Sequence, residues 1–545
     1  MRDLKKLSSK LFDILVIGGG AHGATMACHA AKAGFTTALV DKNDFCGATS
    51  ANSLKIIHGG LRYLQHGNIK RMRHSIRSRR EMMQIAPHLV QPLGCMMPTH
   101  GNGLRGKWLM LAALFLNDCI SWDRNSGLTA EQRLPRGYIV SAEKFREVVP
   151  GFQEDTLTGA AVWYDALAID TERLIMEYLL EANHHGAEAF NYAQASTLTK
   201  GNQGYYLVTV RDQLTGEEHQ VRAQAVVNAA GPWFEHTVQG ISPASEKQKW
   251  ALALNIVSKK QIFQKYAVAL EGASEYEDRD AILKRGKRLY FFVPWRGHTM
   301  IGTEYVISHD DPGNLQVKAE FIQKMIDGVN SIYPHADLKY EDISFYHAGL
   351  MPVQHRSEED NIQLEKNSSF IEHTRDNFNE VISIRGVKFT TAPFVAAEVV
   401  EFLKKRLSGS LRSQPPISKK HSRLPAKQTR LYPFLESRYG RRAAQVFSYM
   451  QEGEGAYVWI DETAPLLKAE LRYLIHEEMA CRLSDVVLRR TGIGTAGCPS
   501  SDFLDKAVLF MGEILDWSEE RCLEEIDEVL RRYAPLKNPP ASENT

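Results

Sequence analysis

Three glycines and an acid near the N-terminus have the types and spacing needed to bind a dinucleotide. Gly18, Gly20 and Gly23 form the pattern G-x-G-x-x-G within the letters GGGAHG, and Asp41 ends the next apolar run. The first glycine permits a tight turn, the second lets the backbone approach a pyrophosphate, and the third allows a helix to pack closely. The acid can accept hydrogen bonds from both hydroxyl groups of an adenosine ribose. The loop alone does not decide between a nicotinamide and a flavin cofactor.

The segments on either side of this loop predict the elements that must position it. Residues 12–17, FDILVI, are rich in β-branched residues, as expected of a buried parallel strand. The alanine-rich residues 24–33 predict a helix that Gly34 ends, and residues 36–41, TTALVD, predict a second strand. Together they form one βαβ unit, in which the N-terminus of the helix favours the negative charge of a phosphate.

The composition is that of an ordinary folded chain. Among 545 residues, 66 Lys or Arg balance 65 Asp or Glu, so no global field attracts nucleic acid. The hydrophobic content of 43% excludes collagen-like and largely disordered classes. The seven cysteines contain no Cys-x-x-Cys pair, which indicates a reducing compartment, and we expect no metal site.

Three later segments carry a resemblance that identifies the cofactor. They read ATSANSLKIIHGGLRYL at residues 48–64, VVNAAGPW at residues 226–233 and RGVKFTTAP at residues 385–393. With the glycine loop, they resemble the FAD-dependent glycerol-3-phosphate dehydrogenases, members of the D-amino-acid-oxidase-like flavoprotein superfamily. The resemblance covers nearly the whole chain, and the block containing HGGLRYL is its most specific motif.

The resemblance implies an α/β fold with a Rossmann-like FAD-binding domain, a mixed-sheet substrate domain and an all-helical C-terminal domain. Within the oxidoreductase core at residues 12–407, we expect FAD-binding parts at about 12–75, 150–235 and 345–407, and substrate-domain parts at about 76–149 and 236–344. Residues 408–427 are rich in Ser, Pro, Lys and Arg and predict a linker. The helical periodicity beyond it predicts a C-terminal domain at residues 428–545.

The same resemblance implies an extended FAD with its adenosine at the βαβ unit and its isoalloxazine ring facing the substrate domain. The expected contacts are Gly18, Gly20, Gly23, Asp41, Thr49, Ser50, His58, Gly231, Lys388 and Thr390. Thr390, Thr391 and Pro393 are also suited to start a helix, whose positive end would face negative charge on a reduced flavin.

His58, Arg62 and Lys388 are the expected catalytic residues. A histidine of ordinary pKa, about 6.5, can accept the hydroxyl proton when an alcohol is oxidised. Arg62 and Lys388 can bind an anionic substrate, and Lys388 can also stabilise charge on a reduced flavin. Structural roles stay open: a satisfied histidine for His58, a surface ion pair for Arg62 and an exposed loop lysine for Lys388.

The substrate half departs from the family pattern. Met351 stands where the family motif GVRP has an arginine that meets the substrate, Asn255 stands where it has a pocket histidine, and Glu304 lies in a changed GTTD motif. Loss of the arginine removes a bidentate anion contact, and charged hydrogen bonds of this kind contribute about 1.5 to 3 kcal/mol each.

The sequence therefore predicts an FAD-dependent dehydrogenase that oxidises a secondary alcohol by hydride transfer to flavin. The resemblance implies conversion of glycerol 3-phosphate, an anionic alcohol, to dihydroxyacetone phosphate, with electrons passing to quinone or another acceptor. One alternative is a related flavin enzyme acting on a different hydroxy or amino compound, because of Met351. A non-catalytic flavin-binding protein and a nicotinamide-dependent dehydrogenase are the others.

We expect a cytoplasmic protein, or one peripheral on the cytoplasmic membrane face. Residues 69–83 place Lys70, Arg73, Arg77 and Arg80 on one helical face, which could dock on anionic lipid but is more simply a solvated face. Residues 108–116, WLMLAALFL, are too few to cross a bilayer. We expect them to form a buried core helix, with a surface membrane anchor as the alternative.

Overall fold

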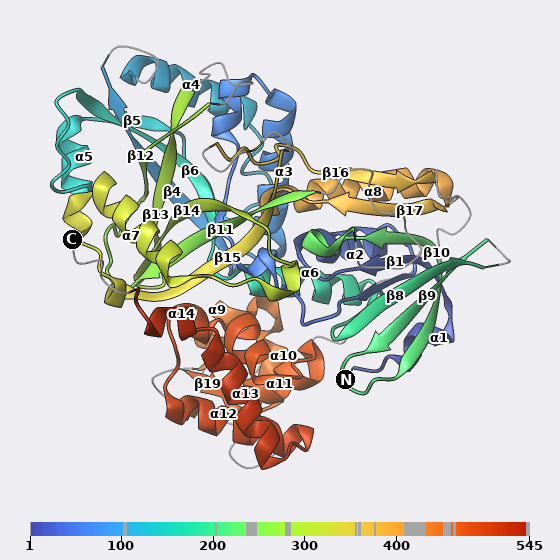
Figure 1. Cartoon of the computed structure of the whole chain (residues 1–545). Coiled ribbons are helices and arrows are strands. Elements are labelled where there is room, and N and C mark those ends of the chain that lie inside the picture. The colour runs from blue at the N-terminus through green and yellow to red at the C-terminus, as the bar shows by residue number, and fades with distance from the viewer. Residues whose placement is uncertain are drawn as a thin grey trace.

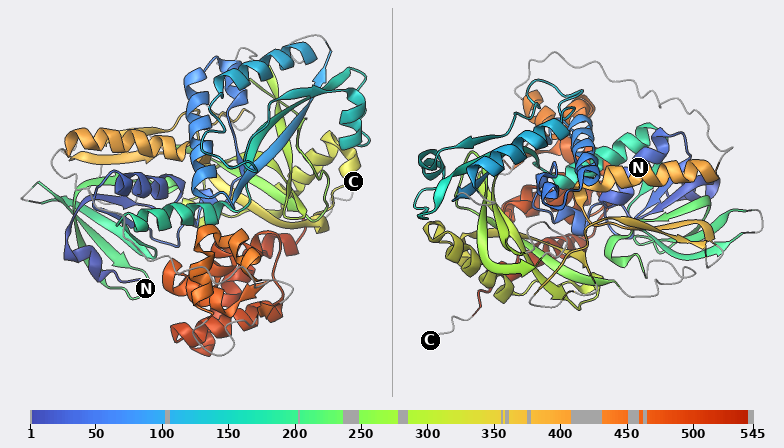
Figure 2. Two further views of the ribbon diagram at one scale, coloured as in Figure 1. Left: turned by 180° about the vertical axis from the view of Figure 1, so that it is seen from behind. Right: turned by 90° about the horizontal axis from the view of Figure 1, so that it is seen from above.

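The structure is a computed structural model, and it describes most of the chain. The described residues are 2–101, 106–201, 204–235, 248–277, 285–354, 357, 361–374, 378–407, 431–450, 459–461 and 465–540. Two sheets lie side by side, and a helical domain packs against both (Figures 1 and 2). The expected linker at 408–427 lies outside the described residues.

The first sheet carries the N-terminal βαβ unit, as the sequence predicts. Its order is β16-β17-β10-β1-β2-β7, in which β17, β10, β1, β2 and β7 are parallel. β8 and β9 extend β10 as an antiparallel ribbon. The bounds are β1 Leu11–Ile17, β2 Thr37–Val40, β7 Glu188–Phe190, β8 Ala193–Lys200, β9 Tyr206–Asp212, β10 Glu218–Asn228, β16 Ser369–His373 and β17 Phe378–Arg385.

Both faces of the first sheet are covered by apolar side chains. On one face, Ile14 and Val16 of β1 pack in a core with three helices, while Leu15 and Ile17 on the other face belong to a cluster with residues of α1 (Lys5–Ser9) and the β8–β9 ribbon. The three helices are α2 Ala21–Lys32, α6 Thr171–His184 and α8 Ala392–Arg406. Burial on both sides explains why β1 is an almost continuous apolar run.

The second sheet is mixed, with the order β15-β11-β14-β13-β12-β4-β6-β3 and with β5 paired to β6. Its neighbouring strands are antiparallel except β12 and β4. Helix α7 (Ala319–Ile332) packs on one face. The bounds are β3 Ile56–Ile57, β4 Val90–His100, β5 Tyr138–Val140, β6 Leu157–Ala168, β11 Lys249–Ser258, β12 Ala267–Glu277, β13 Arg285–Trp295, β14 His298–Ser308 and β15 Ile343–Val353.

The two sheets alternate along the chain more finely than the expected domain boundaries. β3, β6 and β15 fall within ranges assigned to the FAD-binding part, yet all three pair in the second sheet. β6 pairs with β4 along almost its whole length. The alternation of a strand's residues indicates which faces are buried but not which strand will pair with it, so the sequence could not place these segments.

The C-terminal part is a helical domain that shares an apolar core with the second sheet. Leu471, Leu474 and Phe503 of this domain belong to the same buried cluster as Trp163 and Trp295 of the sheet. Besides helices, its described residues contain one small strand pair, β18 Trp459–Asp461 with β19 Leu466–Leu467. The helices are α9 Leu431–Tyr439, α10 Ala443–Ser448, α11 Lys468–Glu478, α12 Ser501–Leu515, α13 Glu519–Arg531 and α14 Ala534–Lys537.

The apolar run at residues 108–116 does not form the expected core helix. It lies in α4 (Lys107–Ile120), whose one buried residue is Leu114. Trp108 is 70% exposed and Phe115 71% exposed. Hydrophobicity alone cannot show whether the fold supplies a partner surface, so the prediction of burial was wrong.

The basic face of residues 69–83 is partly engaged within the protein. These residues lie in α3 (Ile69–Ile85), whose N-terminus is capped by the Asn68 side chain. Arg73 and Arg80 both donate hydrogen bonds to Asp123. The interpretation as a solvated face is therefore wrong for Arg73 and Arg80, two of the four basic residues.

Candidate active site

The glycine turn has no room for side chains. Gly18 has φ +103°, and a Cβ atom there would lie 2.6 Å from the carbonyl oxygen of Ala229. Ala229 directly follows β10, the neighbour of β1 in the sheet. A Cβ atom on Gly23 would overlap the carbonyl oxygen of Gly18. Gly23 is buried beneath the turn, so it contributes by packing, as the pattern predicts, and does not line the cavity.

A cavity of about 700 Å³ opens beside this turn and contains most of the expected site residues. It lies between the two sheets, since residues from both contribute to its wall. The expected residues in the wall are Gly18, Gly20, Asp41, Thr49, Ser50, His58, Gly231, Lys388 and Thr390. The side chain of Arg62 lies outside the described part of the structure, so its expected role stays a prediction.

Asp41 lies at the end of the cavity next to the glycine turn. Its carboxylate accepts hydrogen bonds from the backbone N–H groups of Gly19, at 2.6 Å, and Asn43, at 2.9 Å. Burial raises the pKa of Asp41 to about 6, although these hydrogen bonds oppose the shift. The carboxylate is thus positioned to accept hydrogen bonds from a ribose bound beside the turn.

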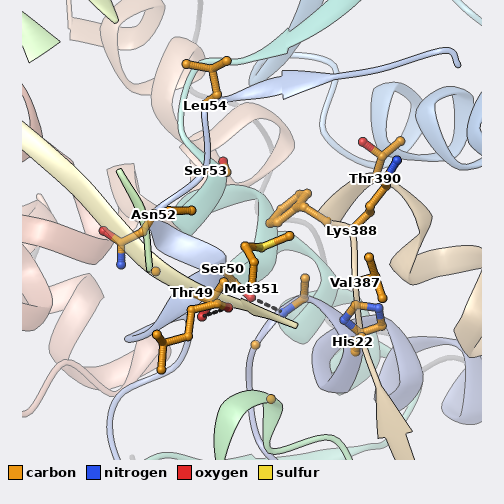
Figure 3. Close-up of a pocket in the computed structure, with 18 of the residues that line it drawn as sticks. His22, Thr49, Ser50, Asn52, Ser53, Leu54, Met351, Val387, Lys388 and Thr390 are labelled. Carbon is orange, nitrogen blue, oxygen red and sulfur yellow. Dashed lines mark hydrogen bonds between the residues drawn. The ribbon is translucent and has the colours of Figure 1, made fainter. Parts of the chain in front are cut away.

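Ser50 and Thr49 connect the turn to the second sheet. The backbone N–H of Ala21, in the first turn of α2, donates to Ser50 Oγ at 2.9 Å, and Thr49 Oγ1 donates to the carbonyl of Leu350 at 3.2 Å. Figure 3 shows these two contacts near Met351. Ser50 therefore accepts a hydrogen bond from one of the backbone N–H groups at the N-terminus of α2.

His22 is a cavity residue that the sequence analysis did not single out. Its ring lies against Gly386, where a Cβ atom would come within 2.9 Å of Nε2. Burial lowers the pKa of His22 to about 4, so the ring is neutral near pH 7. Nε2 is among the buried side-chain atoms of the described residues that have no hydrogen-bond partner. His22 is the histidine in the letters GGGAHG, but no sequence pattern distinguishes a histidine that lines a cavity from any other histidine beside a glycine motif.

His58 is paired with a carboxylate that sequence reasoning missed. Its Nδ1 donates to Asp165 of β6 at 3.3 Å, which leaves Nε2 as the atom with a free lone pair. The His58 side chain is 46% exposed, whereas that of Asp165 is 4% exposed. Both residues line the cavity. The arrangement gives a histidine whose ring orientation and tautomer are fixed by a buried acid.

Asp165 is itself held by several donors. Its carboxylate accepts from Gly59 N–H at 2.5 Å, Arg79 Nη1 at 2.6 Å and Trp163 Nε1 at 3.1 Å. Burial alone would raise the pKa of Asp165, but the hydrogen bond from His58 and the charge of Arg79 lower it to about 2. An acid within an otherwise apolar strand was the one signal in the sequence that could have identified it.

Lys388 lies in the cavity wall and contacts Tyr63. Its Nζ donates to the Tyr63 hydroxyl at 2.7 Å. Burial would raise the pKa of Tyr63, but the nearby charges of Lys388 and Arg71 outweigh it and lower the pKa. Tyr63 therefore fixes the position of the Lys388 ammonium group, which the sequence alone did not indicate.

The departures from the family pattern lie in different places. Met351 and Asn255 line the cavity, and Figure 3 shows Met351 between residues 49–52 and 387–390. Asn255 Oδ1 accepts a hydrogen bond from Thr303 at 2.7 Å. Glu304 is not in the wall, whereas its neighbours Thr303 and Tyr305 are. The changed positions 351 and 255 thus line the cavity, whereas position 304 does not.

The residues around the cavity fit an extended FAD. The glycine turn leaves space for a pyrophosphate, and Asp41 lies at the ribose position beside it. Further along the wall, the buried Nε2 of His22 has no hydrogen-bond partner among the described residues. His58 and Lys388 belong to the same cavity, so they could face the flavin ring and a substrate together.

Matches to family models and relatives agree with this geometry. The family FAD dependent oxidoreductase matches residues 13–402, and the C-terminal domain of alpha-glycerophosphate oxidase matches residues 403–522. A glycerol-3-phosphate dehydrogenase of Synechocystis sp. is 29% identical over 568 residues, covering 98% of this chain and 97% of the relative. The aerobic glycerol-3-phosphate dehydrogenase of Staphylococcus haemolyticus is 26% identical over 516 residues, covering 90% and 88%.

A solved structure confirms the fold. The glycerol-3-phosphate dehydrogenase from Bacillus halodurans complexed with FAD is 23% identical, with a TM-score of 0.70, and covers 98% of this chain and 97% of that chain. The predicted cofactor and the predicted three-part fold are thereby confirmed. The chain belongs to the FAD dependent oxidoreductase family, and it is similar over nearly its whole length to proteins named glycerol-3-phosphate dehydrogenase.

Proposed function

We propose that this protein oxidises the secondary alcohol of glycerol 3-phosphate to the ketone of dihydroxyacetone phosphate and passes the electrons to a quinone. The observation that carries the proposal is the pairing of His58 with the buried Asp165 in one cavity with Lys388. The names of the relatives support the choice of substrate.

The flavin supplies a hydride acceptor when FAD is bound. In this proposal, His58 Nε2 accepts the proton of the substrate hydroxyl, because Asp165 keeps the proton of the neutral ring on Nδ1. Asp165 also stabilises the positive charge that His58 then carries. Lys388 and Arg62 hold anionic groups, and Lys388 is positioned by the Tyr63 hydroxyl.

Flavin bleaching tests the substrate directly. When glycerol 3-phosphate is added to the purified enzyme without oxygen, we expect the oxidised-flavin absorbance to disappear and dihydroxyacetone phosphate to form. Glycerol without the phosphate is the matched control and should bleach the flavin far more slowly, since it lacks the anion for Lys388 and Arg62. Equal rates with both compounds would show that the phosphate is not recognised.

A second candidate substrate class is favoured by Met351 and Asn255, which line the cavity where the family has an arginine and a histidine. The same assay with a panel of other hydroxy and amino compounds distinguishes the two. Bleaching by one of these, and not by glycerol 3-phosphate, would support a related oxidoreductase of different specificity.

Helix α4 supports contact with a membrane surface, which a quinone acceptor would require. Its outward residues Trp108 and Phe115, with Trp122 beyond its end at 80% exposed, form an apolar surface, whereas Met110 and Ala113 of the same helix line the cavity. An apolar quinone in the lipid would therefore meet the cavity wall at this helix. Within the described residues, no helix has both the length and the apolarity to cross a membrane.

Changing the two outward aromatic residues of α4 tests this contact. We expect Trp108→Ser with Phe115→Ser to release the protein from vesicles of anionic and neutral lipid, because exposed aromatic rings partition into the interface. The control is Leu523→Ser in α13, which removes a residue that is 66% exposed in the C-terminal domain. Flotation with vesicles measures binding, and a double variant that still floats like the unchanged protein would contradict the proposal.

A further inference from the structure

The loop that follows Asp41 is tied to the C-terminal domain by a buried ion cluster. Asp44 accepts two hydrogen bonds from Arg490, Nη1 at 2.8 Å and Nη2 at 2.7 Å, and one from Arg489 Nε at 2.6 Å. The Asp44 and Arg490 side chains are 1% and 0% exposed. Burial would raise the pKa of Asp44, but the two arginines lower it to about 2, so the carboxylate is ionised near neutral pH.

Asp44 belongs to the segment that shapes the adenosine end of the cavity. Asp41 accepts from the N–H of Asn43, and the N–H of Cys46 donates to the carbonyl of Gly19 in the glycine turn at 3.1 Å. Asp41 and Asp44 both line the cavity. A shift of Asp44 would therefore move both the Asp41 carboxylate, which is expected to bind the ribose, and the glycine turn.

Further hydrogen bonds hold the residues of this cluster in place. Asn191 donates to Asp44 at 2.9 Å and to the carbonyl of Met479 in the C-terminal domain at 2.8 Å. Arg490 in turn donates to the carbonyl of Glu478 at 3.0 Å. These contacts hold Arg490 and Asp44 in a fixed relative position, and Asp44 lies next to the cofactor site.

We propose that the C-terminal domain is part of the FAD site: Arg489 and Arg490 are positioning residues that act through Asp44 to hold Asp41 and the glycine turn in the geometry that binds the adenosine diphosphate half of FAD. This gives the helical domain a role in retaining the cofactor. The role is independent of which alcohol the enzyme oxidises.

The rate at which FAD leaves the holoenzyme tests the proposal. This rate is measured as the rise in flavin fluorescence when FAD is released. We expect Asp44→Asn and Arg490→Gln each to speed release by about tenfold or more, the effect of losing a charged hydrogen bond. Because both changes break one link, the double variant should release FAD little faster than the faster single variant.

The matched control breaks another ion pair between the same domains. Arg442 of the C-terminal domain pairs with the buried Glu177 of α6, and neither residue lines the cavity. Arg442→Gln should lower the melting temperature but leave the release rate within about twofold of the unchanged enzyme, since the effects of separate sites add independently. Equal acceleration in this control would show a general loosening and overturn the proposal.

ADP supplies a second readout, because it contains the adenosine and diphosphate but no flavin. The dissociation constant of ADP for the full-length apoprotein, measured by calorimetry, should rise in Asp44→Asn by about the factor seen in the release rate. Arg490→Lys keeps the charge but not the bidentate geometry, and it should fall between the unchanged enzyme and Arg490→Gln. Unchanged ADP affinity in Asp44→Asn would overturn the proposal, even if FAD leaves faster.

Discussion

His58→Ala is expected to slow flavin reduction by the substrate by a factor of about 10² to 10⁴, the usual contribution of a positioned general base. The FAD content should stay near that of the unchanged enzyme, because the residues expected to contact the adenosine and diphosphate lie elsewhere in the cavity wall. Stopped-flow absorbance without oxygen measures the rate, and the absorbance spectrum of the purified protein measures bound FAD. Equal losses of rate and FAD content would indicate a merely structural histidine.

His100 provides a matched control for this substitution. Its Nδ1 lies 2.9 Å from Glu154, so it also pairs with a carboxylate, but it is not part of the cavity wall. His100→Ala should leave the rate of flavin reduction unchanged. A comparable loss of rate in this variant would remove the special role of His58.

Asp165 should act through His58. Asp165→Asn alone is expected to slow flavin reduction, whereas in the His58→Ala background it should add little, because residues that act as one unit have non-additive effects. The change also leaves Arg79 without its buried carboxylate, which costs stability, so the rates are compared at a temperature where each variant is folded. Independent, multiplying effects would separate Asp165 from the histidine.

Gly23→Ala is expected to abolish FAD retention. A methyl group at this position would overlap the carbonyl oxygen of Gly18, so either the glycine turn or α2 must move away from the phosphate position. Overpacking of this kind costs about 1 to 3 kcal/mol or more in stability. We therefore expect a colourless protein with a lowered melting temperature, measured by flavin absorbance and thermal unfolding.

Gly328→Ala in α7 is the control for the added methyl group. The nearest atom to a Cβ there is the Tyr290 hydroxyl at 3.8 Å, which is an ordinary contact. Because alanine favours a helix over glycine by about 1 kcal/mol, this variant should keep its FAD and be as stable as the unchanged protein or more so. Gly23→Ala protein that is yellow after purification would contradict the assigned role of the turn.

Much of the cofactor half could be predicted from the sequence because its determinants are local. The glycine turn depends on backbone space within a few residues, and Asp41 follows on the next strand of the same βαβ unit. The HGGLRYL block likewise brought His58 to notice as a contiguous motif. Structure placed His58, Lys388 and Thr390 in one cavity, as the predicted roles require, although those roles await the experiments above.

The partners of these residues could not be predicted, because they come from distant parts of the chain. Asp165 approaches His58 only because β6 pairs with β3 in the second sheet. Tyr63 reaches Lys388 across 325 positions of sequence. The exposure of α4 was misjudged for the same reason, since burial depends on which surfaces the remaining elements leave uncovered.

The amino-acid sequence by itself determined the dinucleotide turn, because the spacing of glycines is a property of neighbouring residues. Its contiguous motifs gave the resemblance to a flavoprotein family, and that resemblance implied the fold class, while helical periodicity indicated the C-terminal domain. Only the tertiary structure decided that Asp165 orients His58, that α4 presents an apolar surface, and that Arg489 and Arg490 reach Asp44. Each of these depends on contacts between segments far apart in the chain. Such contacts are set by packing of the whole molecule, which no local pattern encodes.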